Sequence, residues 1–346
     1  MNTVNKGWLM LIAAFPGSLA AQLPEGIEIA NWYGFKKAAI TYTFDDLTPK
    51  QLPVAVPLFE KYGFTATLYP VVNWNPDWKA LQEVADKGFE IGSHSLSHPN
   101  LASLPVAEQE RELTGSRDSI DAHLRNHKCL SVAYPYCVTG DISIAIKNYF
   151  AARICSNQVE PATPGDFYRI SSIIVGSEWP VNNAAELNKK VMEAEATGGW
   201  CVFLLHGIDD DGGYSAFSSD ELRKHFDYIK ANPEEFWVVP FSDAVKYIRE
   251  RNSLKVTIKQ QSRRRIRLDI KDTLSNSIYN QAVTMRVCIP ANWDRVSIWQ
   301  NGKEITTFQP KQEAEKKVIF NMVPDEGEVS IIRIKTRKAA TTGSTQ

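Results

Sequence analysis

The chain has 346 residues, enough for about two domains of roughly 150 residues each. Its 43% hydrophobic and 23% charged residues exclude collagen-like, coiled-coil and disordered chains. The 39 basic and 40 acidic residues nearly cancel, so the overall charge provides no field that would attract nucleic acid or an anionic membrane surface.

The N-terminus has the pattern of a signal peptide. Lys6 precedes an apolar run over residues 7–15, and the small residues Ser18 and Ala20 stand where signal peptidase accepts them. The apolar run is shorter than the about 20 residues that span a bilayer, and no later segment is long enough. We therefore expect residues 1–20 to be cleaved and the protein to be exported, into a periplasm or to the outside.

Residues 21–250 have the pattern of an α/β domain. Short β-branched or aromatic runs alternate with helical segments, which is typical of βα units around a parallel sheet or barrel. One predicted helix covers residues 76–87 and stops at Gly88, and another begins with a capping box formed by Ser218 and Glu221. The predicted strands are 38–44, 65–71, 89–93, 130–134, 151–155, 168–174, 200–205 and 236–239.

Helical periodicity disappears after residue 252, and residues 254–337 are predicted to form a small β-sandwich. Asn301-Gly302 is a strong hairpin turn. The arginines at 263–265 are read as a solvated strand face rather than a nucleic-acid patch. The polar tail, residues 338–346, is predicted to be disordered. The predicted strands are 254–258, 265–270, 282–289, 295–299, 317–320 and 329–334.

The five cysteines are assigned no chemistry. None of them forms a pair with zinc-ligand spacing, and their odd number leaves at least one thiol unpaired. In an exported protein one or two disulfides could form among them, but the spacing does not say which.

Three polar clusters follow predicted strands and would meet at one rim of a parallel barrel, where active sites of such folds gather. They are Asp45-Asp46, His94 with His98, and His206. Two histidines four residues apart share one face of a helical turn and can bind one metal ion, with a carboxylate from elsewhere. Each cluster alone also has an ordinary explanation, as a capped turn, a pair of surface or core histidines, or a structural histidine.

Together, the motifs resemble those of the polysaccharide deacetylases, the NodB homology domain of carbohydrate esterase family 4. The sequence Thr-Phe-Asp-Asp ending at Asp46 is similar to the first family motif, His-Ser-Leu-Ser-His over residues 94–98 to the second, and Leu-Leu-His ending at His206 to the last. The resemblance covers residues 37–245. It implies a distorted (β/α) barrel that acts on acetylated glycans.

The resemblance also implies roles for individual residues. Asp46, His94 and His98 would bind a divalent ion, most often Zn²⁺, with Co²⁺ or Ni²⁺ as alternatives. Asp45 would be the general base that takes a proton from water, and His206 the acid that protonates the leaving group. The backbone N–H of Tyr136, in the motif Ala-Tyr-Pro-Tyr with Pro135, would stabilise the oxyanion.

Two departures from the family pattern affect this prediction. The third family motif commonly begins with an Arg that orients the catalytic carboxylate, whereas this chain has Ala133, so support for Asp45 must come from elsewhere. The Asp and Trp group that tunes the acid histidine is not evident, and an Asp such as Asp209 or Asp166 is an open alternative. Trp74 and Trp179 are candidates for stacking against a sugar ring, although ordinary packing of a large amphipathic ring is the more common explanation for each.

The leading prediction is a metal-dependent hydrolase that removes N-acetyl groups from an amino-sugar polysaccharide or oligosaccharide. Two alternatives are an O-acetyl esterase acting on a glycan such as xylan and a catalytically silent carbohydrate-binding protein. Asp45 and His206 favour an enzyme, because binding alone requires neither a base nor an acid.

Overall fold

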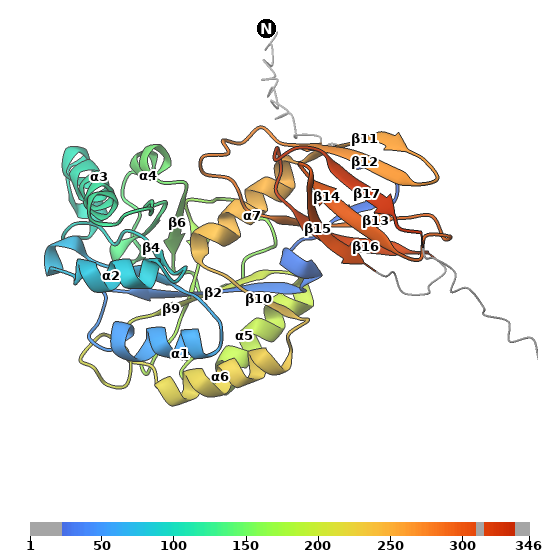
Figure 1. The fold of residues 1–346 in the computed structure, drawn as a ribbon. Helices are drawn as coiled ribbons and strands as arrows, with labels where there is room; N and C mark the ends of the chain where they lie inside the picture. Colours follow the sequence, from blue (N-terminus) through green and yellow to red (C-terminus); the bar gives the residue numbers. More distant parts are fainter. Residues whose placement is uncertain (1–22, 309–314, 336–346) are drawn as a thin grey trace, which may run out of the picture.

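The computed structural model describes residues 23–308 and 315–335. The predicted signal peptide, residues 1–20, and the predicted disordered tail, residues 338–346, lie outside the described residues. The described chain forms an α/β barrel and a β-sandwich, joined through the last helix of the barrel (Figure 1).

The barrel is built from short strands, most of them fully buried. Their bounds are β2 Ala38–Asp45, β3 Thr67–Tyr69, β4 Glu90–Ile91, β5 Ser131–Ala133, β6 Ala151–Ile154, β7 Ile170–Ser171, β8 Ile173–Ile174, β9 Trp200–Leu205 and β10 Phe236–Val238. Parallel pairs join β2 to β3, β3 to β4, β5 to β6, β6 to β7, β8 to β9, and β9 back to β2. β10 pairs in parallel with the first residues of β2.

Two contacts outside the regular strand pairs close the ring of strands, and their irregularity distorts the barrel. A parallel bridge between Ser93 and Val132 connects the chain after β4 to β5. The predicted strand 168–174 is two strands, because the backbone N–H of Ser172 bonds to Ile154 on β6 at 2.9 Å before the chain crosses to β9. The predicted distorted (β/α) barrel is therefore confirmed by a closed ring of parallel pairs.

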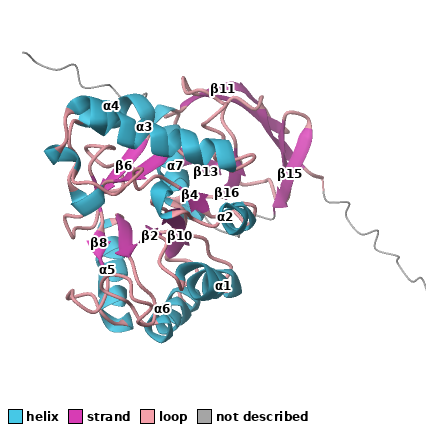
Figure 2. Cartoon of the chain, turned by 90° about the vertical axis from the view of Figure 1, so that its left-hand side faces the viewer, coloured by secondary structure: helices cyan, strands magenta, loops and turns pink. Residues whose placement is uncertain are grey.

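The helices cover two sides of the barrel, with α1, α5 and α6 on one side and α3 with α4 on the other (Figure 2). The starts of α2 and α6 are capped by side chains, and the cap of α6 by Ser218 was predicted. The side chain of Asp77 accepts the N–H of Ala80 at 3.0 Å, and Ser218 Oγ accepts that of Glu221 at 3.4 Å. The bounds are α1 Val56–Lys61, α2 Trp78–Ala85, α3 Val106–His123, α4 Ile142–Asn148, α5 Ala184–Thr197, α6 Ser219–Ala231 and α7 Phe241–Ser253.

The predicted capping box at α6 is only half formed. The carboxylate of Glu221 accepts the N–H of Ala184 at 2.8 Å, so it ties the start of α5 to α6 rather than returning to Ser218. A local motif in the sequence cannot show that a neighbouring helix competes for the same carboxylate.

The C-terminal strands form two antiparallel sheets. One has the order β11-β12-β17-β14-β15 and the other β1-β13-β16. Asn301 and Gly302 have φ of 47° and 73°, as the predicted hairpin turn between β14 and β15 requires. The bounds are β1 Ile27–Ile29, β11 Lys255–Gln261, β12 Arg265–Lys271, β13 Val283–Cys288, β14 Val296–Gln300, β15 Lys303–Phe308, β16 Lys317–Met322 and β17 Val329–Arg333.

Two strands of the sandwich were not predicted. β15 follows the hairpin turn, and β1 pairs antiparallel with β13 although it comes from the start of the chain. The predicted barrel range, 21–250, therefore begins with a strand of the sandwich. The local sequence of β1 does not predict that it pairs with β13, which lies about 250 residues further along the chain.

α7 lies between the barrel and the sandwich (Figure 1). One apolar core runs through this junction: it contains Trp200 of β9, Phe241 and Tyr247 of α7, and Leu268 and Val283 of the sandwich. Because both parts share one core, the sandwich packs against the base of the barrel and leaves the opposite rim to the site described next.

Candidate metal centre and active site

Asp45 is the last residue of β2 and is held by a buried arginine. Arg153 on β6 donates from Nη2 to both carboxylate oxygens, at 2.5 and 2.6 Å. Arg153 is 0% exposed and Asp45 3%. The guanidinium also donates to Ser172 Oγ at 3.1 Å and lies over the ring of Tyr69, 5.4 Å from its centroid. The pair therefore fixes the position and rotamer of the carboxylate beneath the rim.

The charge of Asp45 is maintained by its neighbours. Burial alone would raise the pKa of this carboxyl, but Arg153, with smaller contributions from His94 and His206, lowers the pKa below its ordinary value. Asp45 is therefore an ionised carboxylate in a site with little solvent, which is the form that accepts a proton.

Arg153 takes the place of the arginine that is missing at residue 133. Ala133 on β5 and Arg153 on β6 are partners in the strand register, so their side chains leave the sheet on the same side. The small Ala133 leaves room for the guanidinium from the next strand. Sequence reasoning missed Arg153, although one charged residue inside the apolar run Ala-Ala-Arg-Ile-Cys was a signal, because buried arginines are almost always paired.

Asp46, His94 and His98 come together beside Asp45. One ligand atom from each lies within 4.8 Å of the others. Asp46 Oδ1 is 3.7 Å from Nε2 of His94 and 3.7 Å from Nε2 of His98. These separations are too long for hydrogen bonds and match two ligands of one ion, whose bonds to nitrogen or oxygen are about 2.0–2.2 Å long.

The side-chain chemistry of this cluster also fits a cation. Asp46 Oδ1 is buried and has no hydrogen-bond partner among the described residues. His94 Nδ1 lies 2.7 Å from the carbonyl oxygen of Ala133, so it donates there and leaves Nε2 as a lone-pair donor. Burial lowers the pKa of His94 to about 4, and burial together with the charge of Asp45 raises the pKa of Asp46 to about 7. A divalent cation would stabilise the ionised carboxylate between two neutral imidazoles.

The two histidines do not lie on a helical turn, as the sequence predicted. The segment after β4 is an irregular turn in which Ser95 and His98 have φ of 66° and 62°. Ser95 Oγ accepts the N–H of His98 at 2.9 Å, and Glu112 of α3 accepts both the N–H and the hydroxyl of Ser97, each at 2.8 Å. Side chain to backbone bonds therefore replace a helical ladder and turn both imidazoles toward Asp46.

His206 follows β9 and faces the same site. Burial lowers its pKa, while the charge of Asp45 opposes this. Its Nδ1 is buried without a hydrogen-bond partner among the described residues. Neither proposed aspartate contacts it: Asp209 accepts from the backbone and hydroxyl of Ser219, and Asp166 accepts from Tyr168 and Arg169. Among the described residues, no carboxylate is hydrogen-bonded to the ring of His206.

A cavity of about 710 Å³ opens over these residues. Tyr136 is 64% exposed at its edge, with its ring 4.7 Å from that of His98, and Pro135 lies buried just before it. Trp179 also lines the cavity and donates to the hydroxyl of Tyr214 at 3.1 Å. Trp74, 5.5 Å from the ring of His98, lines an adjoining groove of about 340 Å³ on the far side of Asp46.

A disulfide between Cys137 and Cys155 also lines the cavity. The spacing of the cysteines did not show this pairing, because the bond joins the segments that follow two neighbouring strands, β5 and β6, and only the barrel brings these segments together.

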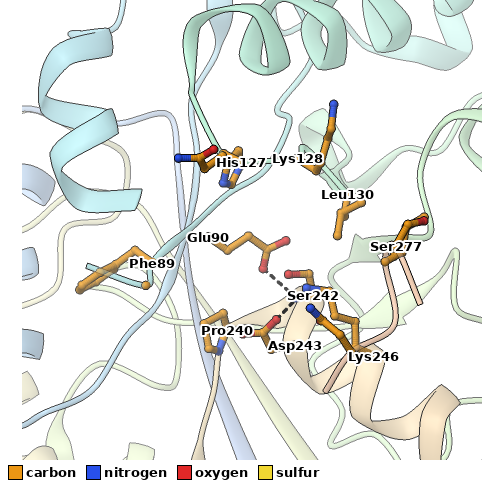
Figure 3. A pocket seen from close by; sticks show the side chains of 14 residues that line it. Phe89, Glu90, His127, Lys128, Leu130, Pro240, Ser242, Asp243, Lys246 and Ser277 are labelled. Atoms are coloured by element: carbon orange, nitrogen blue, oxygen red, sulfur yellow. Dashed lines mark hydrogen bonds and ion pairs between the residues drawn. The ribbon is translucent and has the colours of Figure 1, made fainter. Parts of the chain in front are cut away.

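A second pocket, of about 260 Å³, is lined by Glu90 at the start of β4 and by Ser242 of α7 (Figure 3). Burial raises the pKa of Glu90 there, but its carboxylate accepts from Ser131 Oγ at 2.5 Å, Thr67 Oγ1 at 2.9 Å and the N–H of Ser242 at 2.7 Å. Because Ser242 lies in the first turn of α7, Glu90 fastens this helix to the base of the barrel. Its donors account for both oxygens, so the pocket is a structural junction.

No helix among residues 23–308 and 315–335 combines the length and the apolar character needed to cross a membrane.

The comparisons with known proteins agree with the motifs. Residues 33–153 match the family model described as polysaccharide deacetylase. A peptidoglycan-N-acetylglucosamine deacetylase of Bacillus cereus is 24% identical over 212 residues, which cover 60% of this chain and 68% of that protein. The solved structure of the peptidoglycan deacetylase PdaC from Bacillus subtilis is 19% identical, with a TM-score of 0.44, and the match covers 61% of this chain and 91% of PdaC.

A much longer protein matches more of the chain. A gellan lyase from a Bacillus species is 24% identical over 326 residues, which cover 88% of this chain but only 13% of the lyase. A match of this length includes part of the C-terminal sandwich as well as the barrel. The segment that matches the family model contains Asp45, Asp46, His94, His98 and Arg153, so this part of the chain, with the residues of the site, is similar to the polysaccharide deacetylases.

Proposed function

We propose that the protein is an exported, metal-dependent deacetylase that hydrolyses N-acetyl groups of an amino-sugar glycan. One observation carries the proposal: an ionised carboxylate, Asp45, is held by a buried arginine directly beside a cluster of one Asp and two His that fits a divalent cation. A binding protein has no need for a second, unligated carboxylate in this position.

Each residue of the site has a separate role in the proposed hydrolysis of the amide. Asp46, His94 and His98 would hold the cation, for which Zn²⁺ is our first choice because of the donor set, with Co²⁺ or Ni²⁺ as substitutes. Such a cation supplies Lewis acidity to water and to an acetyl carbonyl. Asp45 accepts the proton of the attacking water, and the N–H of Tyr136 donates to the developing oxyanion. His206 gives a proton to the leaving amine.

Two further observations support the details of the proposal. The Bacillus cereus relative is named for N-acetylglucosamine in peptidoglycan, which favours an N-acetyl group over an O-acetyl group as the target. The disulfide between Cys137 and Cys155 supports export, because disulfides persist in oxidising compartments.

The test is acetate release with and without metal. The protein, stripped of metal with a chelator and reloaded with Zn²⁺, is incubated with acetylated chitooligosaccharides and, separately, with acetylated xylan. We expect zinc-dependent release from the chitooligosaccharides. Release from xylan alone would identify an O-acetyl esterase. No release from either substrate, with one zinc ion bound per chain, would favour the silent carbohydrate-binding protein and overturn the proposal.

A further inference from the structure

The disulfide between Cys137 and Cys155 joins the two segments that position the reacting groups. Cys137 directly follows Tyr136, and Cys155 directly follows β6, two residues after Arg153. The Cα atoms of the two cysteines are 5.6 Å apart. The other three cysteines, all within the described ranges, are free.

The turn that carries Tyr136 needs external support. Tyr136 and Cys137 both have left-handed backbone conformations, with φ of 55° and 61°, which are unfavourable for residues other than glycine. Two backbone hydrogen bonds lie within the turn, from Cys137 to Tyr134 at 3.0 Å and from Val138 to Pro135 at 3.1 Å, and the N–H of Tyr134 donates to the carbonyl oxygen of Arg153 at 3.3 Å. Contacts from outside the turn therefore support its conformation, and the disulfide is the covalent one among them.

The other end of the disulfide belongs to the strand that holds the base. Arg153 lies on β6, and Cys155 comes directly after the end of this strand and lines the cavity. Arg153 binds the carboxylate of Asp45, and Cys155 reaches the wall of the cavity above it. One covalent bond thus links the support of Asp45 to the turn that carries the proposed oxyanion donor.

We propose that Cys137 and Cys155 are positioning residues whose disulfide holds the Tyr136 turn in its catalytic conformation, so that full activity requires the oxidised protein. This inference rests on the proposed deacetylase function. Both cysteines line the cavity and are partly exposed, so a soluble reductant can approach the bond. A phosphine reductant gives two thiols and a phosphine oxide, with water supplying the oxygen atom and the two protons.

The experiment compares the oxidised and reduced protein, loaded with zinc, in two measurements. Hydrogen–deuterium exchange should accelerate at residues 134–138 after treatment with tris(carboxyethyl)phosphine, while the strands of the barrel stay protected. The kcat for acetate release should fall at least about tenfold, since small misplacements of catalytic groups reduce rates strongly. KM and the bound zinc should change less than kcat.

Two variants serve as controls. Cys137→Ser/Cys155→Ser should show the reduced kcat at once and should not respond to the phosphine, which excludes an effect of the reagent on the metal. Cys129→Ala/Cys201→Ala removes two buried free thiols and should respond to the phosphine as the natural sequence does.

Unchanged exchange at residues 134–138 on reduction, or a reduced protein that keeps kcat within twofold, would overturn the inference. If the oxidised protein releases no acetate at all, the proposed function fails, and the exchange measurement still decides whether the disulfide orders the turn.

Discussion

Replacement of Arg153 tests the central feature of the site. Arg153→Met keeps the length and apolar character of the side chain but leaves the carboxylate of Asp45 buried without its partner. Removing one member of a buried ion pair destabilises a protein by about 3–5 kcal/mol. For a domain of this size, such a loss corresponds to a fall in Tm of roughly 6–20 °C. A loss of stability in this range is expected because Arg153 is fully buried and donates to both carboxylate oxygens of Asp45.

The measurement is thermal unfolding of the natural sequence and its variants at neutral pH, with acetate release measured in parallel. Arg169→Met is the matched control, since Arg169 pairs with Asp166 at 2.9 Å on the surface, where ion pairs contribute about 0–1 kcal/mol. The double variant Arg153→Ala/Ala133→Arg moves the guanidinium to the neighbouring strand and should recover part of the lost kcat. An Arg153→Met protein with unchanged Tm and kcat would refute the role of this pair.

Three further predictions concern single residues. Asp45→Asn should lower kcat by about 10²–10⁴-fold while one zinc ion per chain remains bound, as elemental analysis can show; near-normal turnover would contradict the base assignment. His98→Ala should weaken zinc binding by more than the about 10–100-fold typical of changes to residues that only hydrogen-bond to a metal ligand, and calorimetry that finds unchanged affinity would exclude His98 as a ligand. Glu250 on α7 is 0% exposed and its carboxylate oxygens have no hydrogen-bond partner among the described residues, and burial, followed by Asp272, raises its pKa to about 8. Above pH 4.5, the ordinary pKa of a glutamate, the unfolded chain releases the proton of Glu250 while the folded chain still binds it. The free energy of unfolding should therefore fall as the pH rises from about 5 to 8, by up to about 4–5 kcal/mol. Glu250→Gln should remove this fall, and equal pH profiles of unfolding would contradict the prediction.

The sequence alone was sufficient for features that depend on local pattern. Alternating strands and helices predicted βα units around a parallel sheet or barrel, and the turn at Asn301-Gly302 predicted its hairpin. The polar residues after the strands predicted which side chains would gather at one rim, because parallel strands bring their carboxyl ends together. Asp45, Asp46, His94, His98 and His206 do lie together there.

The tertiary structure decided everything that depends on which neighbour a residue meets. Arg153 could be recognised as the partner of Asp45 only once the register placed β6 beside β5, and the pairing of Cys137 with Cys155 required the same contact. β1 pairs with β13 of the sandwich because the fold brings the start of the chain beside this strand, whose backbone groups on that side would otherwise have no hydrogen-bond partner. Local periodicity specifies the form of a segment, whereas partners are selected by packing between residues far apart in the chain, and a single sequence carries no direct record of that selection.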